Sequence, residues 1–197
     1  MGRWQPGSKA RLAAAAFELY AEQGYEATTG AQIAARAGMH ERSFFRLFAD
    51  KREVPFHGME EMWDRFAASI KSAPEGTSAL DLARTAVEEQ CEIIQSHPTH
   101  ARLRHDVIAE SAELRERDLF KHAELADALT AALRNRGVEA ATARLTAEGC
   151  IVALRIAVET WLPDAPRDDL IATFRTMLAV FAASFSGASP TNAAAQH

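Results

Sequence analysis

The stretch TTGAQIAARAGMHERSFFRLFADK, residues 28–51, decides the fold at the N-terminal end of the chain. Thr29-x-x-Gln32 is a capping box, which predicts that a short helix begins at Thr29. This helix is expected to end after Ala37, because Gly38 adopts positive φ at little cost. A second helix is expected to begin after His40, where apolar residues recur at helical spacing. The stretch therefore predicts two short helices joined by a tight turn.

The two helices have the features of a helix-turn-helix. This motif needs a small residue where its helices cross, a glycine in the turn and apolar residues that hold the second helix in place. Ala34 supplies the small residue and Gly38 the turn. The positions expected in the shared core are Ile33, Ala37, Met39, Phe44 and Leu47. The alternative is a generic corner of two helices whose charges are merely solvated.

The second helix leaves a polar and basic side exposed. Its residues on that side are His40, Glu41, Arg42, Ser43, Phe45 and Arg46. A helix of this kind lies in the major groove of double-stranded DNA, with its N-terminal residues at base edges and its basic residues near phosphates or guanine. The pattern therefore predicts a DNA-reading helix.

The charge distribution agrees with a DNA-binding N-terminus. The formal net charge of the 197-residue chain is −5, yet residues 1–52 hold eight Lys and Arg against five acidic residues, a net +3. The remainder is therefore −8. A basic N-terminus on an acidic body indicates that only the N-terminus meets a polyanion. The alternative is that so small an excess arose by chance.

The rest of the chain is expected to be helical, giving an all-α fold of about nine helices. The first helix should run from a Ser8 N-cap to Gln23 and stop at Gly24. Asp50-x-x-Glu53 predicts another capped helix to residue 71, with Pro55 causing a kink or a later start. Further helices are expected over about residues 79–95, 140–162 and 167–185. Between the first two of these, a short helix is expected to end at about residue 109 and a longer one at residue 135.

Composition excludes several classes of protein. No apolar run approaches the roughly 20 residues of a membrane span, and the N-terminus lacks a secretory signal. Cys91 and Cys150 lack metal-type spacing, so reduced thiols in a cytoplasm are expected, with a disulfide as the alternative. His97, His100 and His105 are expected to be surface residues and not metal ligands. No catalytic motif or cofactor-binding loop occurs, so we expect no enzyme, no cofactor and no metal.

Two segments resemble the TetR family of one-component transcriptional regulators: AAFELYAEQGYEATT (15–29) and IAARAGMHERSFFRLFADKREV (33–54). The resemblance implies a DNA-binding domain over residues 1–50 and a ligand-binding, dimerising domain over residues 51–186. A small, polar tail, 187–197, is expected to be disordered. The resemblance also implies a dimeric repressor on a palindromic operator, released when a small apolar or amphipathic effector changes the spacing of its two DNA-binding heads.

The resemblance, together with the exposed helix, defines a set of expected DNA contacts. Thr29 caps the first helix of the motif near a phosphate, and Lys51 matches a phosphate-contacting lysine of the family. Phe45 stands where the family most often has tyrosine, so it offers apolar contact, as with a thymine methyl, in place of a hydroxyl bond. The complete set is Thr28, Thr29, His40, Arg42, Ser43, Phe45, Arg46 and Lys51.

Two further sets of candidate site residues lie in the expected ligand-binding and dimerising domain. The last two expected helices have apolar faces. In the TetR family the corresponding helices pair with the same helices of a second copy, so the resemblance predicts a homodimer interface here. The alternative is a purely intramolecular core. The interface set is Ile151, Leu154, Val158, Phe174, Met177, Leu178 and Phe181. Met and aromatic residues suit adaptable apolar pockets, although each of them also suits ordinary core packing. The pocket set is Met59, Met62, Trp63, Phe66, Cys91, Ile94, Phe120 and Trp161.

Arg155 interrupts an apolar run, and we expect an ion pair with Glu159 one turn on rather than an anchor for an anionic ligand. Two alternatives to a ligand-responsive regulator stay open. One is a regulator controlled by a protein partner. The other is a helical enzyme or small-molecule-binding protein whose N-terminal domain is only structural.

Overall fold

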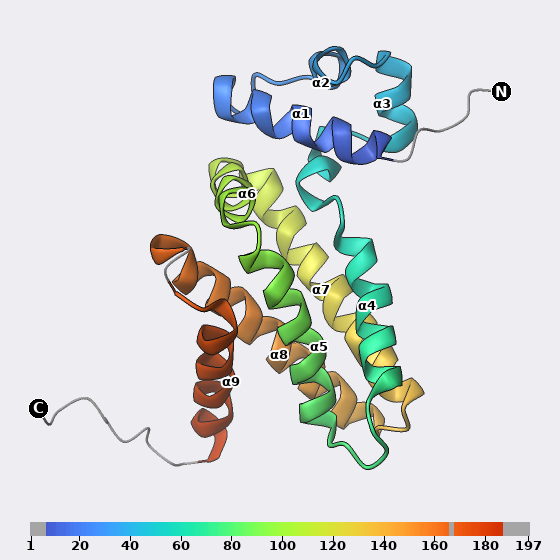
Figure 1. The fold of residues 1–197 in the computed structure, drawn as a ribbon, viewed down its shortest axis with the longest axis vertical. Helices are drawn as coiled ribbons and strands as arrows, with labels where there is room; N and C mark the ends of the chain where they lie inside the picture. The colour runs from blue at the N-terminus through green and yellow to red at the C-terminus, as the bar shows by residue number, and fades with distance from the viewer. Residues whose placement is uncertain (1–6, 166–167, 187–197) are drawn as a thin grey trace, which may run out of the picture. The chain divides into compact units, whose positions relative to one another are not determined.

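The computed structural model describes residues 7–165 and 168–186 (Figure 1). Over these ranges the chain forms nine α-helices and two short 3-10 helices, with no strand, which confirms the all-α prediction. The elements are α1 Ser8–Gln23, α2 Gly30–Arg36, α3 Glu41–Leu47, η1 Lys51–Phe56, α4 Met59–Ser72, α5 Ala79–Gln95, α6 Pro98–Glu110, α7 Ala112–Asn135, α8 Ala140–Trp161, η2 Leu162–Asp164 and α9 Leu170–Ser186.

The chain divides into two compact units. The first holds the described residues up to Glu61 together with Thr99–Ala123, and the second holds Met62–Pro98 and the described residues from Glu124 onward. The first unit therefore contains α1–α3 and η1, and also α6 and the first half of α7. The boundary expected after residue 50 falls inside this unit, and the tail expected at 187–197 lies outside the described residues.

One hydrophobic core holds the first unit together. It joins the three N-terminal helices to η1, to α6 and to the start of α7. Its members are Leu12, Ala13, Ala15, Ala16, Phe17, Leu19, Tyr20, Tyr25, Ile33, Ala34, Ala37, Phe44, Phe48, Val54, Phe56, Val107, Ile108 and Leu114. The helix-turn-helix is therefore packed on residues that lie more than 50 positions later in the chain.

The ends of α1 and α2 follow local rules, except that α1 has a different N-cap from the one expected. The capping box is present, since Thr29 Oγ1 accepts from Gln32 N at 3.2 Å and Thr29 N donates to Gln32 Oε1 at 2.8 Å. Gly38 has φ of 66°, as the turn requires, and Gly24 ends α1. Ser8 is not the N-cap, because Gly7 takes that position and the buried Ser8 begins the helix.

The predicted helix over residues 50–71 is divided. Asp50 does accept from Arg52 N at 2.7 Å, but Glu53 makes no reciprocal bond and pairs with α7 instead. Pro55 lies inside a 3-10 helix, and Gly58, with φ of 96°, separates that helix from α4. The later helix start expected from Pro55 is therefore confirmed.

In the second unit α9 packs on α8 and α5. A Cβ at Gly149 would lie 2.8 Å from Phe181 Cε1, so the glycine permits α8 and α9 to approach closely. Trp161 Nε1 donates to Asp168 O at 2.8 Å and Gln95 Oε1 accepts from Leu170 N at 3.1 Å, which ties the ends of α8 and α5 to the start of α9. Among the described residues, no helix has both the length and the apolar character that a membrane span requires.

Candidate nucleic-acid interface

The crossing of α2 and α3 depends on Gly30 as well as on Ala34. A Cβ at Gly30 would lie 2.8 Å from Phe44 Cδ1 and 3.3 Å from Phe45 Cζ. Ala34 and Phe44 are fully buried. The role of Gly30 was missed in the sequence, although its place directly after the capping Thr29 was a signal of close approach.

The exposed face of α3 carries the residues expected to contact DNA. His40 is the N-cap but makes no side-chain capping bond. Arg42 and Arg46 are exposed, and Ser43 is half-buried. Within the described part of the chain, Arg42 forms no ion pair or side-chain hydrogen bond. Its guanidinium is therefore available to a phosphate or a guanine.

Phe45 is fixed at the rim of the same face. Its ring is 53% exposed and meets the ring of Phe44 edge-on, with centroids 5.2 Å apart. This contact, together with its closeness to Gly30, leaves one side of the ring open. The open side presents an apolar surface of the kind that contacts a thymine methyl group.

Two basic residues near α3 are neutralised within the domain. Arg36 binds Glu22 at 2.6 Å and Glu18 at 3.2 Å. Arg52 binds Asp50 and Glu113. These two basic residues are therefore already paired with carboxylates, which the overall charge count did not reveal.

Lys51 is engaged in holding the turn after α1. Its Nζ donates to Tyr25 O at 3.0 Å and Glu26 O at 3.2 Å, and lies 4.3 Å from the centroid of the Tyr25 ring. An ammonium group has three donors. One donor therefore remains for a phosphate, and contact of Lys51 with DNA stays a prediction.

Thr28 does not belong to the DNA-contacting set. It is 1% exposed, and its Oγ1 donates to Gly24 O at 2.8 Å while accepting from Gln23 Nε2 at 3.2 Å. Thr28 is therefore a buried turn residue. Thr29 is exposed and keeps its predicted place at the start of α2.

The residues expected to line an effector pocket are divided between the units. Met59 and Phe120 belong to the first unit and the other six to the second. Those six are the buried Met62, Phe66, Cys91 and Trp161 and the half-buried Trp63 and Ile94. Phe120 does not line an enclosed cavity, because it is 52% exposed and lies beneath the Arg117 guanidinium at 5.0 Å.

Two buried polar atoms of the second unit belong to Trp63, which the sequence placed in the pocket set, and to Gln90, which it did not. Trp63 Nε1 and Gln90 Oε1 are buried and have no hydrogen-bond partner within the described ranges. Buried polar atoms normally have partners, so Trp63 Nε1–H could donate to a polar group of a ligand and Gln90 Oε1 could accept from one. Cys91 and Cys150 are free and buried, and burial raises the pKa of each thiol to about 12.

The residues expected at a dimer interface are mostly core residues of one chain. Packing of α8 on α9 already buries Ile151, Leu154, Phe174 and Leu178. Val158, Met177 and Phe181 are half-buried. Among the described residues of these helices, the large apolar side chains that are exposed are Leu145, Ile156 and Val180. A one-turn ion pair joins Arg155 and Glu159 at 3.1 Å, as predicted.

The three clustered histidines serve no common site in the described residues. Over those residues, no group of three His, Cys, Asp or Glu side chains is placed to hold a metal ion. His100 packs edge-on against the Phe17 ring, with centroids 4.8 Å apart. His97 bonds locally with Ser96.

The comparisons with known proteins agree with this geometry. Residues 12–54 match the family model for bacterial regulatory proteins of the tetR family. This chain carries a TetR-family N-terminal domain. The HTH-type transcriptional regulator TcmR of Streptomyces glaucescens is 42% identical over 65 residues. That alignment covers 33% of this chain and 29% of TcmR, so it spans less than a third of the relative's length.

Solved structures show the TetR-family fold over nearly the whole chain. FadR of Thermus thermophilus, a repressor in complex with lauroyl-CoA, has a TM-score of 0.61 at 17% identity, covering 96% of this chain and 99% of that one. FadR of Bacillus subtilis, in complex with stearoyl-CoA, has a TM-score of 0.57 at 21% identity, covering 87% and 96%. At these identities the likeness concerns the fold.

Proposed function

We propose that this chain is a sequence-specific DNA-binding transcriptional regulator, and that it acts as a repressor released by a small apolar or amphipathic effector. The observation that carries the proposal is the exposed face of α3, which presents the apolar ring of Phe45 and Arg42, a residue without an ion pair or side-chain hydrogen bond to any other described residue. The close packing of Gly30 against Phe44 holds that face in a fixed orientation. A rigid helix with an available guanidinium suits direct readout in the major groove.

The proposed DNA contacts are His40, Arg42, Ser43, Phe45 and Arg46 on α3, with Thr29 and Lys51 at its flanks. Arg42 is assigned to a base edge or phosphate and Phe45 to a thymine methyl. Lys51 is assigned to a phosphate, through the donor that the Tyr25 and Glu26 carbonyls leave unused. Phosphate contacts set the register of the protein on DNA and base contacts set the sequence.

We propose that the active species is a homodimer on a palindromic operator. Leu145 of α8 and Val180 of α9 are 72% and 46% exposed, and Ile156 lies on the same face of α8 as Leu145. Exposed large apolar side chains on two helices that pack on each other suit a second copy of the chain. A two-fold dimer would place two α3 helices on half-sites about one DNA turn apart.

We propose that the effector enters the second unit. The buried side chains of Met62, Phe66 and Trp161 would contact its apolar part, and the unpartnered Trp63 Nε1 and Gln90 Oε1 would meet a polar group. The FadR structures with lauroyl-CoA and stearoyl-CoA are similar in fold. Acyl-CoA thioesters are therefore the first compounds to test.

The test is a fluorescence-anisotropy titration at about 150 mM salt, where non-specific phosphate binding is weak. DNA from immediately upstream of the protein's own gene is compared with scrambled DNA of equal composition. Tight binding to the upstream DNA only, reversed by lauroyl-CoA, is the expected result. Absence of binding to either DNA at any salt concentration would favour a helical small-molecule-binding protein whose N-terminal domain is structural. Release by a protein partner, but by no small molecule, would favour the other alternative.

A further inference from the structure

Two glutamates of α1 hold the last residue of α2. Arg36 Nη1 donates to Glu22 Oε1 at 2.8 Å and Arg36 Nη2 donates to Glu22 Oε2 at 2.6 Å, so this ion pair is bidentate. Arg36 Nη1 also donates to Glu18 Oε2 at 3.2 Å. Glu18 and Glu22 lie one turn apart on the same face of α1, and both carboxylates therefore meet one guanidinium.

The geometry of this cluster is stronger than that of an ordinary surface ion pair. Isolated surface pairs contribute little, whereas a bidentate arginine–carboxylate pair within a network is an exception. The hydrogen bonds from Arg36 lower the pKa of Glu22 below its ordinary value, as expected of a carboxylate that is paired in the folded protein. The cluster therefore restricts the end of α2.

Two further side chains of α1 hold the backbone and the start of α2. Arg11 Nη2 donates to Ala37 O at 2.6 Å. Ala37 is the C-cap of α2, where carbonyl groups lack partners within the helix and a cation is favourable. Near the start of α2, Gln23 Nε2 donates to Gln32 Oε1 at 3.3 Å. Both ends of α2 are thus tied to α1.

The end of α2 is also the entry to α3. Only residues 37–40 separate Arg36 from Glu41, which is the first residue of α3. Met39 N donates to Ala34 O at 2.8 Å, which keeps this connection tight. A rotation of the end of α2 is therefore passed directly to α3.

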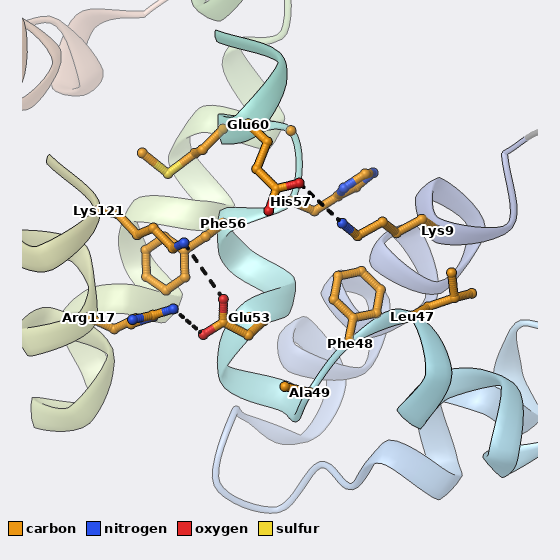
Figure 2. Close-up of a pocket in the computed structure, with 12 residues that line it drawn as sticks. Lys9, Leu47, Phe48, Ala49, Glu53, Phe56, His57, Glu60, Arg117 and Lys121 are labelled. Atoms are coloured by element: carbon orange, nitrogen blue, oxygen red, sulfur yellow. Dashed lines mark ion pairs between the residues drawn. The ribbon is translucent and has the colours of Figure 1, made fainter. Parts of the chain in front are cut away.

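Ion pairs also hold the segment that follows α3. Figure 2 shows the carboxylate of Glu53, on η1, between Arg117 and Lys121 of α7, at 2.8 Å and 3.8 Å. Lys51, the first residue of η1, comes four positions after Leu47, the last residue of α3. The helix α3 is therefore held through α2 on one side and through η1 on the other.

We propose that Glu18 and Glu22 are positioning residues, which set the orientation of α3 for DNA through Arg36. This inference rests on the proposed DNA-binding function, and neither glutamate is assigned a contact with DNA. It predicts an effect opposite to that of charge. Loss of two carboxylates reduces repulsion of the phosphates, so electrostatics alone would tighten DNA binding. Loss of positioning weakens binding to the upstream DNA instead.

Three variants of the full-length protein separate pairing from charge. The alanine variant, Glu18→Ala/Glu22→Ala, removes both carboxylates at exposed helical positions, where alanine is favourable. The swap variant, Glu18→Arg/Glu22→Arg/Arg36→Glu, restores the ion pairs with reversed polarity. The matched control is Glu110→Ala/Glu116→Ala, whose exposed carboxylates form no ion pair or side-chain hydrogen bond in the described ranges. All three raise the formal net charge of the chain by the same amount.

Hydrogen exchange measured by mass spectrometry tests the effect on α2 and α3 without DNA. We expect their amides to exchange about fivefold faster in the alanine variant, and to return to within about twofold of the unmodified protein in the swap variant. The control should show no change. Amides of α6, in the same unit and core, should keep their rates in every variant, which distinguishes this effect from general destabilisation. Unchanged exchange of α2 and α3 in the alanine variant overturns the proposal, as does a swap variant that exchanges equally fast.

Anisotropy titrations on the upstream and the scrambled DNA at about 150 mM salt test the effect on DNA binding. Binding to the upstream DNA is expected to weaken about fivefold in the alanine variant, to recover in the swap variant, and to stay equal or become tighter in the control. An alanine variant that binds the upstream DNA as tightly as the unmodified protein, or more tightly, overturns the proposal. If the unmodified protein does not distinguish the two DNAs, the proposed function fails, whereas the exchange data still support or overturn the hold of Glu18 and Glu22 on α2.

Discussion

Arg104 Nε donates a hydrogen bond to the carbonyl oxygen of Pro55 at 2.9 Å, across 49 positions of sequence. The same guanidinium binds Asp118 at 2.8 Å and lies 5.3 Å from the centroid of the Phe56 ring. One half-buried side chain on α6 therefore ties α7 to the η1 turn that follows the helix-turn-helix. The proline carbonyl lies in a 3-10 helix, where its usual α-helical partner is missing.

Arg104→Met is expected to destabilise the protein. It removes the donor for Pro55 O and leaves the mostly buried Asp118 carboxylate without its arginine partner, so we expect a loss of about 1–3 kcal/mol. Urea unfolding followed by circular dichroism measures the change. Arg102→Met on the same helix is the control, because Arg102 is exposed and has no side-chain bond in the described residues. Equal loss in both variants would contradict the role of Arg104.

Gly30→Ala tests the close packing of the helix-turn-helix. The new Cβ would lie 2.8 Å from the Phe44 ring, so α2 and α3 must separate or the ring must move. Overpacking of this kind costs roughly 1–3 kcal/mol. Loss of unfolding free energy by that amount, with weaker DNA binding, is expected. Ala31→Ser at the neighbouring exposed position should leave both properties unchanged. If Gly30→Ala is as stable as the unmodified protein, the Phe44 ring can move without cost and the close packing is not required.

Leu145→Glu tests the proposed dimer face. A charge at this exposed position would have to be buried by a second copy, which is unfavourable without a partner charge. Light scattering after gel filtration is expected to show a dimer for the unmodified protein and a monomer for Leu145→Glu. Leu119→Glu, at a similarly exposed leucine of α7, is expected to remain dimeric. If the Leu145 variant stays dimeric at micromolar concentration, the interface lies elsewhere.

The lowered pKa of Glu88 predicts that the stability of the protein depends in part on this carboxylate at acidic pH. The hydrogen bond from Arg175 lowers the pKa of Glu88 below its ordinary value of 4.5, with Arg84 assisting and burial opposing. A lowered pKa in the folded state adds stability that is fully present above pH 4.5 and is lost as pH falls through the lowered value. Glu88→Gln should therefore lose less unfolding free energy than the unmodified protein between neutral and strongly acidic pH.

Urea unfolding of both proteins at neutral pH and at strongly acidic pH measures this difference in unfolding free energy. Glu92→Gln, an exposed residue of the same helix, is expected to keep the pH dependence of the unmodified protein. An unchanged pH dependence in Glu88→Gln would mean that the Arg175 pair contributes little. Arg175 is itself 58% exposed, so solvent screens this pair and the effect should be modest.

Local signals predicted most of the fold. Capping at Thr29, the positive φ of Gly38 and the stop at Gly24 depend on near neighbours, so the sequence shows them directly. The capping box expected at Asp50 does not form, because Glu53 forms an ion pair with Arg117, which lies 64 positions later in the chain. A long-range partner of this kind leaves no periodic pattern in the sequence.

Availability of the candidate site residues was harder to predict than their position. Thr28 and Arg36 carry the right chemistry for contact with DNA, yet one is buried and the other holds two carboxylates. On α8 and α9, apolar periodicity identified Ile151 and Phe174 but did not distinguish a core face from an interface face. These distinctions depend on which neighbours the fold brings near, and periodicity along one helix does not contain them.

The most direct test of the central claim compares two arginine variants on DNA. Arg42→Ala removes a cation of α3 that has no ion pair among the described residues, and Arg155→Ala removes an equal charge that is paired with Glu159 on α8. Anisotropy titrations on the upstream DNA at about 150 mM salt should show binding weakened roughly tenfold or more by Arg42→Ala, and unchanged by Arg155→Ala. Equal affinity of both variants and the unmodified protein would contradict the assignment of α3 as the DNA-reading helix.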